Sequence, residues 1–112
     1  MLNIVAVTAC VSGVAHTYMA AERLEKLCHQ ERWHASIETQ GALGTENALS
    51  EGDLKQADVA LLITDIEING QGRFAGMRTI KTSIRTFLLH PEKITEVVRH
   101  IKDKPVVHLV IE

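Results

Sequence analysis

Two short apolar segments of this chain have the pattern of strands that are buried on both faces. They are residues 2–7 and 59–63, and neither shows the regular alternation of apolar and polar side chains that a half-exposed strand has. Strands of this kind occur in parallel sheets that are covered by helices on both sides. The two segments therefore predict an α/β domain built on a parallel sheet.

Helix and strand patterns alternate along the rest of the chain. Apolar residues at helical spacing, a Ser50–Asp53 capping pair and Pro91 at a first turn predict three helices, over residues 15–30, 51–56 and 91–103. Weaker apolar segments predict strands at residues 35–39 and 77–80. We expect one domain, residues 1–112, in three layers: a four-stranded parallel sheet with helices on both faces. Residues 106–111 either extend the sheet edge or contact a partner.

Composition excludes several classes of function. The chain has 112 residues, 46% of them hydrophobic, which is enough for one core. The 12 Lys and Arg against 14 Asp and Glu give a net charge of −2, so we expect no general attraction to nucleic acid. The apolar stretches fall far short of the roughly 20 residues of a membrane span, and no signal sequence opens the chain. We therefore expect a cytoplasmic protein that does not insert into a membrane.

A cysteine lies where the first predicted strand ends and the first predicted helix begins. Backbone N–H groups at a helix N-terminus are unpaired and favour an anion, so this position should stabilise a thiolate and hold a phosphoryl group on it. The predicted nucleophile is Cys10, and no metal or cofactor is expected. The predicted phosphate-binding residues follow it directly: Val11, Ser12, Gly13, Val14, Ala15, His16 and Thr17.

Other residues should approach this loop in space. Ligands of open parallel sheets bind outside the carboxyl ends of the strands, where the strand order reverses. If the first strand lies between the next two, Gln40 and Gly41 emerge beside Cys10 as possible neighbouring loop residues, and so does Asp65. We interpret Asp65 as a turn residue, because a second anion would repel a phosphorylated cysteine.

Residue spacing leaves three functions open. Cysteine-based phosphatases use C-x5-R, in which the arginine grips phosphate with a bidentate fork, and here His16 occupies the arginine position. One imidazole holds phosphate less rigidly, which favours a phosphocarrier transferase over a phosphatase-like protein. A non-catalytic regulatory module that keeps the anion pocket is the third possibility. Structural roles are also open, with Cys10 as a small core residue and Thr17 as a helix cap.

The remaining cysteine, histidines and arginines have simpler interpretations. Cys28 lies on the apolar face of the first predicted helix and should belong to the core. We expect the other histidines at the surface: His29, His34, His90, His100 and His108. Three arginines are either solvated charges or contacts for an acidic partner: Arg23, Arg32 and Arg73.

Six segments resemble a known family. They are residues 4–10, 13–22, 38–41, 57–59, 65–66 and 73–76, and they resemble the fructose-type enzyme IIB domains of the bacterial phosphoenolpyruvate-dependent sugar phosphotransferase system, or PTS. The resemblance covers about the first hundred residues. One departure lies in the loop: the family usually has Pro-Thr after the cysteine, where this chain has Val11-Ser12. That change keeps the hydroxyl and restores a backbone N–H.

The resemblance implies a specific relay. It implies that Cys10 accepts a phosphoryl group from a phosphohistidine on a IIA protein or domain and passes it to a fructose-like sugar bound by the membrane component IIC. IIC would be supplied by another chain, with which this protein would associate peripherally. The contacts that select the sugar would lie in IIC. The resemblance also implies the four-stranded parallel sheet that the residue pattern predicts.

Overall fold

The apolar segments at 2–7 and 59–63 form the two central strands of the sheet, β1 (Asn3–Ala9) and β4 (Val59–Thr64). The computed structural model describes residues 1–10 and 14–112. Every residue of β4 is buried, and in β1 every residue after the first is buried. The two strands pair in parallel, with Ile4 opposite Val59. The prediction of strands covered on both faces is therefore confirmed.

The sheet has six strands rather than the four that we predicted. Its other strands are β2 (His34–Gly41), β3 (Gly44–Glu46), β5 (Thr79–Thr82) and β6 (His108–Ile111), and the order is β3-β2-β1-β4-β5-β6. All neighbouring strands run parallel except β2 and β3, which pair antiparallel. The chain turns tightly at residues 42–43 and folds back into β3, whose first residue, Gly44, has a φ of 90°. This conformation favours glycine.

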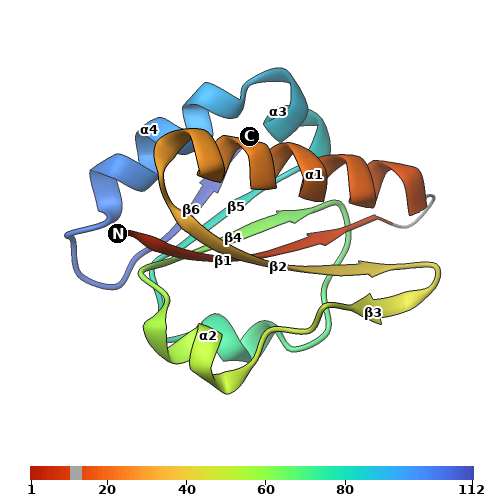
Figure 1. The fold of residues 1–112 in the computed structure, drawn as a ribbon, viewed down its shortest axis with the longest axis horizontal. Coiled ribbons are helices and arrows are strands. Elements are labelled where there is room, and N and C mark those ends of the chain that lie inside the picture. Colours follow the sequence, from red (N-terminus) through yellow and green to blue (C-terminus); the bar gives the residue numbers. More distant parts are fainter. Residues whose placement is uncertain (11–13) are drawn as a thin grey trace.

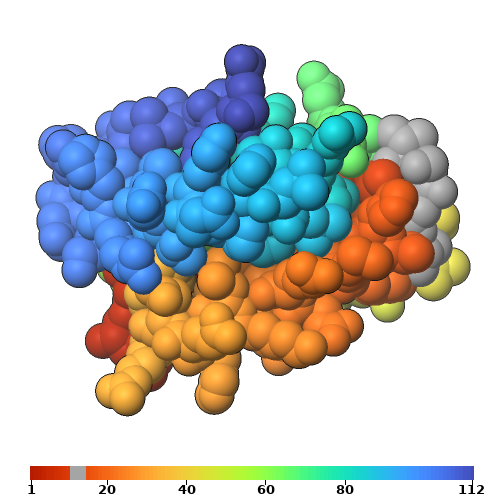
Figure 2. Space-filling model, turned by 90° about the horizontal axis from the view of Figure 1, so that it is seen from above, coloured from red at the N-terminus to blue at the C-terminus, as the bar shows by residue number. Residues whose placement is uncertain are grey.

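Helices cover both faces of the sheet, as predicted. The helices α1 (Val14–Glu31), α3 (Ile84–Leu89) and α4 (Pro91–Ile101) lie on one face, and α2 (Glu51–Gln56) lies on the other (Figure 1). The 3-10 helix η1 (Gln71–Phe74) packs on the α2 side through Phe74. Figure 2 shows α1 in orange beside α3 and α4 in cyan and blue. Two apolar cores result, one on each side of the sheet.

The predicted elements match the structure to different degrees. The Ser50 hydroxyl accepts the Asp53 N–H and the Asp53 carboxylate accepts the Ser50 N–H, both at 3.0 Å, so the predicted capping box opens α2. The strand expected at 77–80 lies two residues later, as β5. The sequence analysis missed α3, since six residues are too few for a helical period to stand out. None of the helices in the described part of the chain could cross a membrane.

Candidate functional site

Cys10 directly follows β1 at the edge of the sheet where the parallel strands end. Because β1 lies between β2 and β4, the end of β2 and the loop after β4 flank this position, as the sequence analysis expected. Gln40 on β2 is opposite Ala9, and the Asp65 N–H donates to the Ala9 carbonyl at 3.0 Å. The residues next to Cys10 are thus held from both sides.

Cys10 opens onto a pocket of about 290 Å³. Only 6% of the residue is exposed, so it lies at the pocket wall. The other lining residues come from the end of β2, the β2–β3 hairpin and the loop after β4: Gln40, Gly41, Ala42, Gly44, Thr45, Ile66, Glu67 and Asn69. A water molecule occupies about 30 Å³ of liquid, so the pocket has room for a tetrahedral anion. The predicted neighbours Gln40 and Gly41 lie in the same pocket as Cys10.

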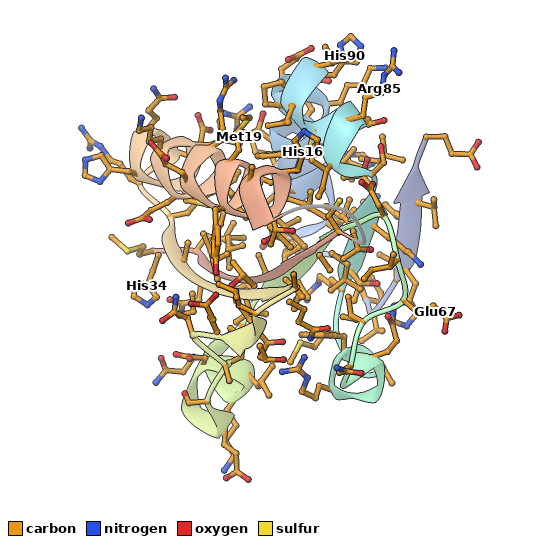
Figure 3. All side chains as sticks on the ribbon, turned by 90° about the vertical axis from the view of Figure 1, so that its right-hand side faces the viewer. His16, Met19, His34, Glu67, Arg85 and His90 are labelled. Carbon is orange, nitrogen blue, oxygen red and sulfur yellow. The ribbon has the colours of Figure 1, made fainter. Side chains whose placement is uncertain are left out.

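His16 lies in a second hollow. It is exposed on the first turn of α1 and lines a hollow of about 430 Å³ with Asp65 and with residues of α3. The α3 residues are Ile84, Arg85, Leu88 and Leu89. In Figure 3, turned so that the right-hand side of Figure 1 faces the viewer, His16 lies beside the helix that carries Arg85, and Glu67 points outward from the loop after β4. The imidazole therefore faces α3 and the solvent.

The other predicted loop residues divide between surface and interior. Val14 begins α1, and Ala15 is exposed. Thr17 is buried, its carbonyl accepts the Thr8 hydroxyl at 3.1 Å, and its own hydroxyl has no hydrogen-bond partner among the residues that the structure describes. This hydroxyl is near the pocket, since a Cβ on Gly41 would be 4.0 Å from it. Val11, Ser12 and Gly13 lie outside the described residues.

A buried carboxylate, that of Glu38, bonds a residue that lines the pocket. Glu38 on β2 is 1% exposed and receives both terminal nitrogens of Arg73 at 2.8 and 2.9 Å. It also accepts the Leu49 N–H at 3.0 Å and the Gln40 side-chain amide at 2.7 Å. The Arg73 guanidinium packs over the Phe74 ring, 5.0 Å from its centroid. Every acceptor position of the carboxylate is thereby used.

Hydrogen bonds keep this carboxylate ionised. Burial by itself would raise the pKa of Glu38, but the hydrogen bonds from Arg73, Gln40 and Leu49 outweigh it and lower the pKa from 4.5 to about 2. The pKa of Arg73 is raised by the same pairing. Because the Glu38 pKa is depressed, its contribution to stability is present above about pH 4.5 and is lost as the pH falls toward 2. Arg73 is thus an internal partner, which corrects the interpretation of it as a solvated charge or partner contact.

Most of the remaining expectations about reactive side chains are confirmed. Cys28 is 1% exposed, and burial raises the pKa of its thiol to about 12, so it is a core residue. Asp65 accepts the first N–H of α3 at 3.1 Å, as suits a turn residue. The histidines expected at the surface are exposed. His108 in addition bonds Thr79 and the Ala75 carbonyl.

Comparison with known proteins decides the family. Residues 5–97 match the family model of the PTS system, Lactose/Cellobiose specific IIB subunit. The chain is 59% identical, over the full length of both proteins, to the PTS system fructose-like EIIB component 3 of Escherichia coli K12. The chain belongs to the enzyme IIB family. It is a phosphocarrier component of sugar phosphotransfer, and IIB components act as phosphotransferases.

Solved structures of IIB proteins share the fold. A crystal structure of a predicted fructose-specific IIB from Escherichia coli matches with a TM-score of 0.97 and 58% identity over all of both chains. A domain of the fructose-specific IIABC component of Borrelia burgdorferi matches with a TM-score of 0.79 and 43% identity, over 85% of this chain and 90% of that one. This IIB protein thus has the mixed α/β fold of its relatives, with a mostly parallel sheet of six strands.

The Glu38–Arg73 pair and six of the nine pocket-lining residues of this IIB protein were not predicted from the sequence. A signal for Glu38 was present, because Glu38 and Thr39 are polar residues at the carboxyl end of the predicted strand 35–39, and polar Gln40 follows them directly. Charged residues in such a position are seldom buried without a partner. The partner itself, 35 residues away, left no local pattern.

Proposed function

We propose that Cys10 is the residue on which this IIB protein carries the phosphoryl group, from a IIA phosphohistidine to a fructose-like sugar bound by IIC. The observation that carries the proposal is a cysteine at the wall of an open pocket, at the carboxyl edge of a parallel sheet, in a chain of the IIB family. The name of the Borrelia burgdorferi relative joins IIA, IIB and IIC in one component, which supports both partners. Residues 1–112 act as one IIB unit.

Two displacements at phosphorus complete the relay. The Cys10 thiolate attacks the phosphorus of phosphohistidine, so that an S–P bond forms, the N–P bond breaks and the imidazole recovers a proton. A sugar hydroxyl then attacks the same phosphorus and loses its proton, the O–P bond forms and the thiolate leaves. Cys10 is the covalent nucleophile in the first step, and in the second step the S–P bond breaks and Cys10 is the leaving group. In this proposal the backbone N–H groups of residues 11–17 stabilise the transferring oxygens, and the N-terminus of the 18-residue helix α1 favours their negative charge.

The hollow that His16 lines is the proposed docking face for the protein partners. It is lined by Asp65, whose N–H bonds the residue before Cys10, and by the apolar side chain of Leu89, which is 59% exposed. Met19 lies nearby on α1 and is 43% exposed (Figure 3). Exposed apolar groups beside charged ones are typical of surfaces that bind other proteins. In this proposal the IIB protein acts in the cytoplasm and associates peripherally with IIC.

Intact mass spectrometry tests the proposal. The protein is incubated with phosphoenolpyruvate, enzyme I, HPr and a matching IIA, and the mass is measured before and after. We expect the gain of one phosphoryl group, lost in Cys10→Ser and kept in Cys28→Ala. Addition of sugar and IIC should discharge it.

Other outcomes support the alternatives. Steady release of inorganic phosphate without sugar would indicate a phosphatase-like protein. A wild-type mass that never changes would indicate a regulatory module that keeps the anion pocket.

A further inference from the structure

The side-chain amide of Gln40 helps to hold one wall of the Cys10 pocket in place. Gln40 accepts the Asn69 backbone N–H at 2.8 Å and donates to the Asn69 carbonyl at 3.0 Å. Both Gln40 and Asn69 line the pocket. Gln40 therefore ties the loop after β4 to the end of β2, across the strand that ends at the nucleophile.

The Gln40 amide has no remaining donor for a ligand. Its two N–H groups go to the Glu38 carboxylate and the Asn69 carbonyl, and its oxygen goes to the Asn69 N–H. An amide nitrogen has two donors only. Its role toward a phosphoryl group is therefore to position the pocket wall and not to bind the group.

Glu38 and Arg73 determine which way this amide faces. The Glu38 carboxylate is acceptor-only, so it forces the nitrogen of Gln40 toward itself and the oxygen toward the Asn69 N–H. Arg73 also bonds this loop: its guanidinium donates to the carbonyls of Asn69 at 3.0 Å and Gly70 at 2.8 Å. The ion pair is thus connected to the pocket wall twice, once through Gln40 and once through Arg73.

We infer that the Glu38–Arg73 pair, in which the carboxylate is buried and the arginine is 25% exposed, is a positioning device for phosphoryl transfer that acts through Gln40. It sets the separation between the loop after β4 and the end of β2, and so the width of the pocket in which the group on Cys10 is transferred. This inference rests on the proposed function of Cys10. Buried, fully hydrogen-bonded ion pairs are stiff, and transfer rates respond steeply to small displacements of reacting groups.

Two variants test the inference at different points. Arg73→Lys keeps the charge and removes the bidentate fork, and Gln40→Met keeps the ion pair and removes the tie to Asn69. Three quantities are measured: hydrogen exchange of the Asn69 amide, the rate of Cys10 alkylation by iodoacetamide, and single-turnover phosphorylation at varied phospho-IIA concentration. In both variants we expect hydrogen exchange of the Asn69 amide to be about tenfold faster than in wild type. We expect the rate constant of Cys10 alkylation to differ from the wild-type value by about tenfold. The maximal transfer rate should fall about tenfold, with less than about a twofold change in the half-saturating donor concentration.

A remote ion pair supplies the matched control. Arg99 on α4 bonds Glu31 at the far end of α1 from Cys10, so Arg99→Lys makes the same chemical change away from the pocket. All three quantities should stay within about twofold of wild type in this variant. Equal effects in Arg99→Lys and Arg73→Lys would mean a general loss of stability and would overturn the inference.

Two further results bear on the inference. Unchanged Asn69 exchange in Gln40→Met, or faster exchange with wild-type alkylation and transfer, would also overturn it. If wild type takes no phosphoryl group at all, the proposed function fails, and the exchange and alkylation rates alone then decide whether the pair positions the pocket.

Discussion

Two side chains of the predicted phosphate loop differ sharply in how the structure places them. Cys10 lies at the wall of an open pocket, whereas the Thr17 hydroxyl is buried with no hydrogen-bond partner among the described residues. A buried hydroxyl without a partner costs about 1–3 kcal/mol. A group kept at such a cost calls for an explanation, and a role toward the phosphoryl group is one.

A valine in place of Thr17 separates stability from function. Thr17→Val should raise the free energy of unfolding by about 1 kcal/mol, because the unpaired hydroxyl is gone. It should also slow phosphorylation of Cys10 by about tenfold, because a donor is lost. Urea denaturation and single-turnover transfer measure the two effects, with Thr17→Ser as the control that keeps the hydroxyl. A wild-type transfer rate in Thr17→Val would remove Thr17 from the phosphate-binding residues.

The short helix η1 lies near the pocket, and the turn at its start determines where the side chain of Arg73 lies. The 3-10 helix η1 begins after Gly70, whose φ is 78°, and this turn delivers Arg73 to Glu38. A Cβ at position 70 would lie 2.5 Å from the Arg73 Nε. The guanidinium cannot simply swing away, because Glu38 holds it by two hydrogen bonds.

Alanine substitutions at two glycines test this turn. Gly70→Ala should lower the free energy of unfolding by about 1–3 kcal/mol, through the positive φ and the displaced Arg73. Gly72→Ala is the matched control, since a Cβ there meets nothing within 4 Å. It should change stability by less than about 0.5 kcal/mol. Equal midpoints for the two variants in urea would contradict this account of the turn.

At the scale of the whole molecule, the C-terminal segment forms the last strand at one edge of the sheet. β6 pairs in parallel with β5, and the Thr79 N–H donates to the Val107 carbonyl at 2.8 Å. Leu109 and Ile111 pack against the core on the α1 side. The sheet-edge alternative for residues 106–111 is therefore confirmed.

Removal of residues 106–112 should weaken the whole fold. Loss of three half-buried aliphatic side chains, Val107, Leu109 and Ile111, should cost about 3 kcal/mol, and the uncovered edge of β5 should promote association between molecules. Urea denaturation and light scattering measure the two effects. Val110→Thr, at an exposed position of β6, should have little effect on either. A truncated protein as stable and as monomeric as the full chain would show that β6 is dispensable.

The sequence predicted the layers and the place of Cys10 at the carboxyl edge of the sheet because both depend on local patterns. Continuous apolar residues indicate buried strands, Ser50 and Asp53 form a cap within one turn, and Cys10 directly follows the first of these strands. Extra strands were missed because a three-residue strand such as β3 has no measurable period. β6 is a strand because it pairs with β5, and this pairing between distant segments cannot be predicted from the residues of β6 alone.

By itself, the sequence determined that the chain forms a helix-covered parallel sheet with Cys10 at its carboxyl edge, since strand and helix periods are carried by neighbouring residues. Tertiary structure alone decided that Arg73 pairs with Glu38, that Gln40 turns its amide toward the loop, and that His16 faces α3. These outcomes depend on which side chains meet across elements. Contacts of this kind are determined by how the elements pack and by the need of buried charges for hydrogen-bond partners, and not by sequence spacing.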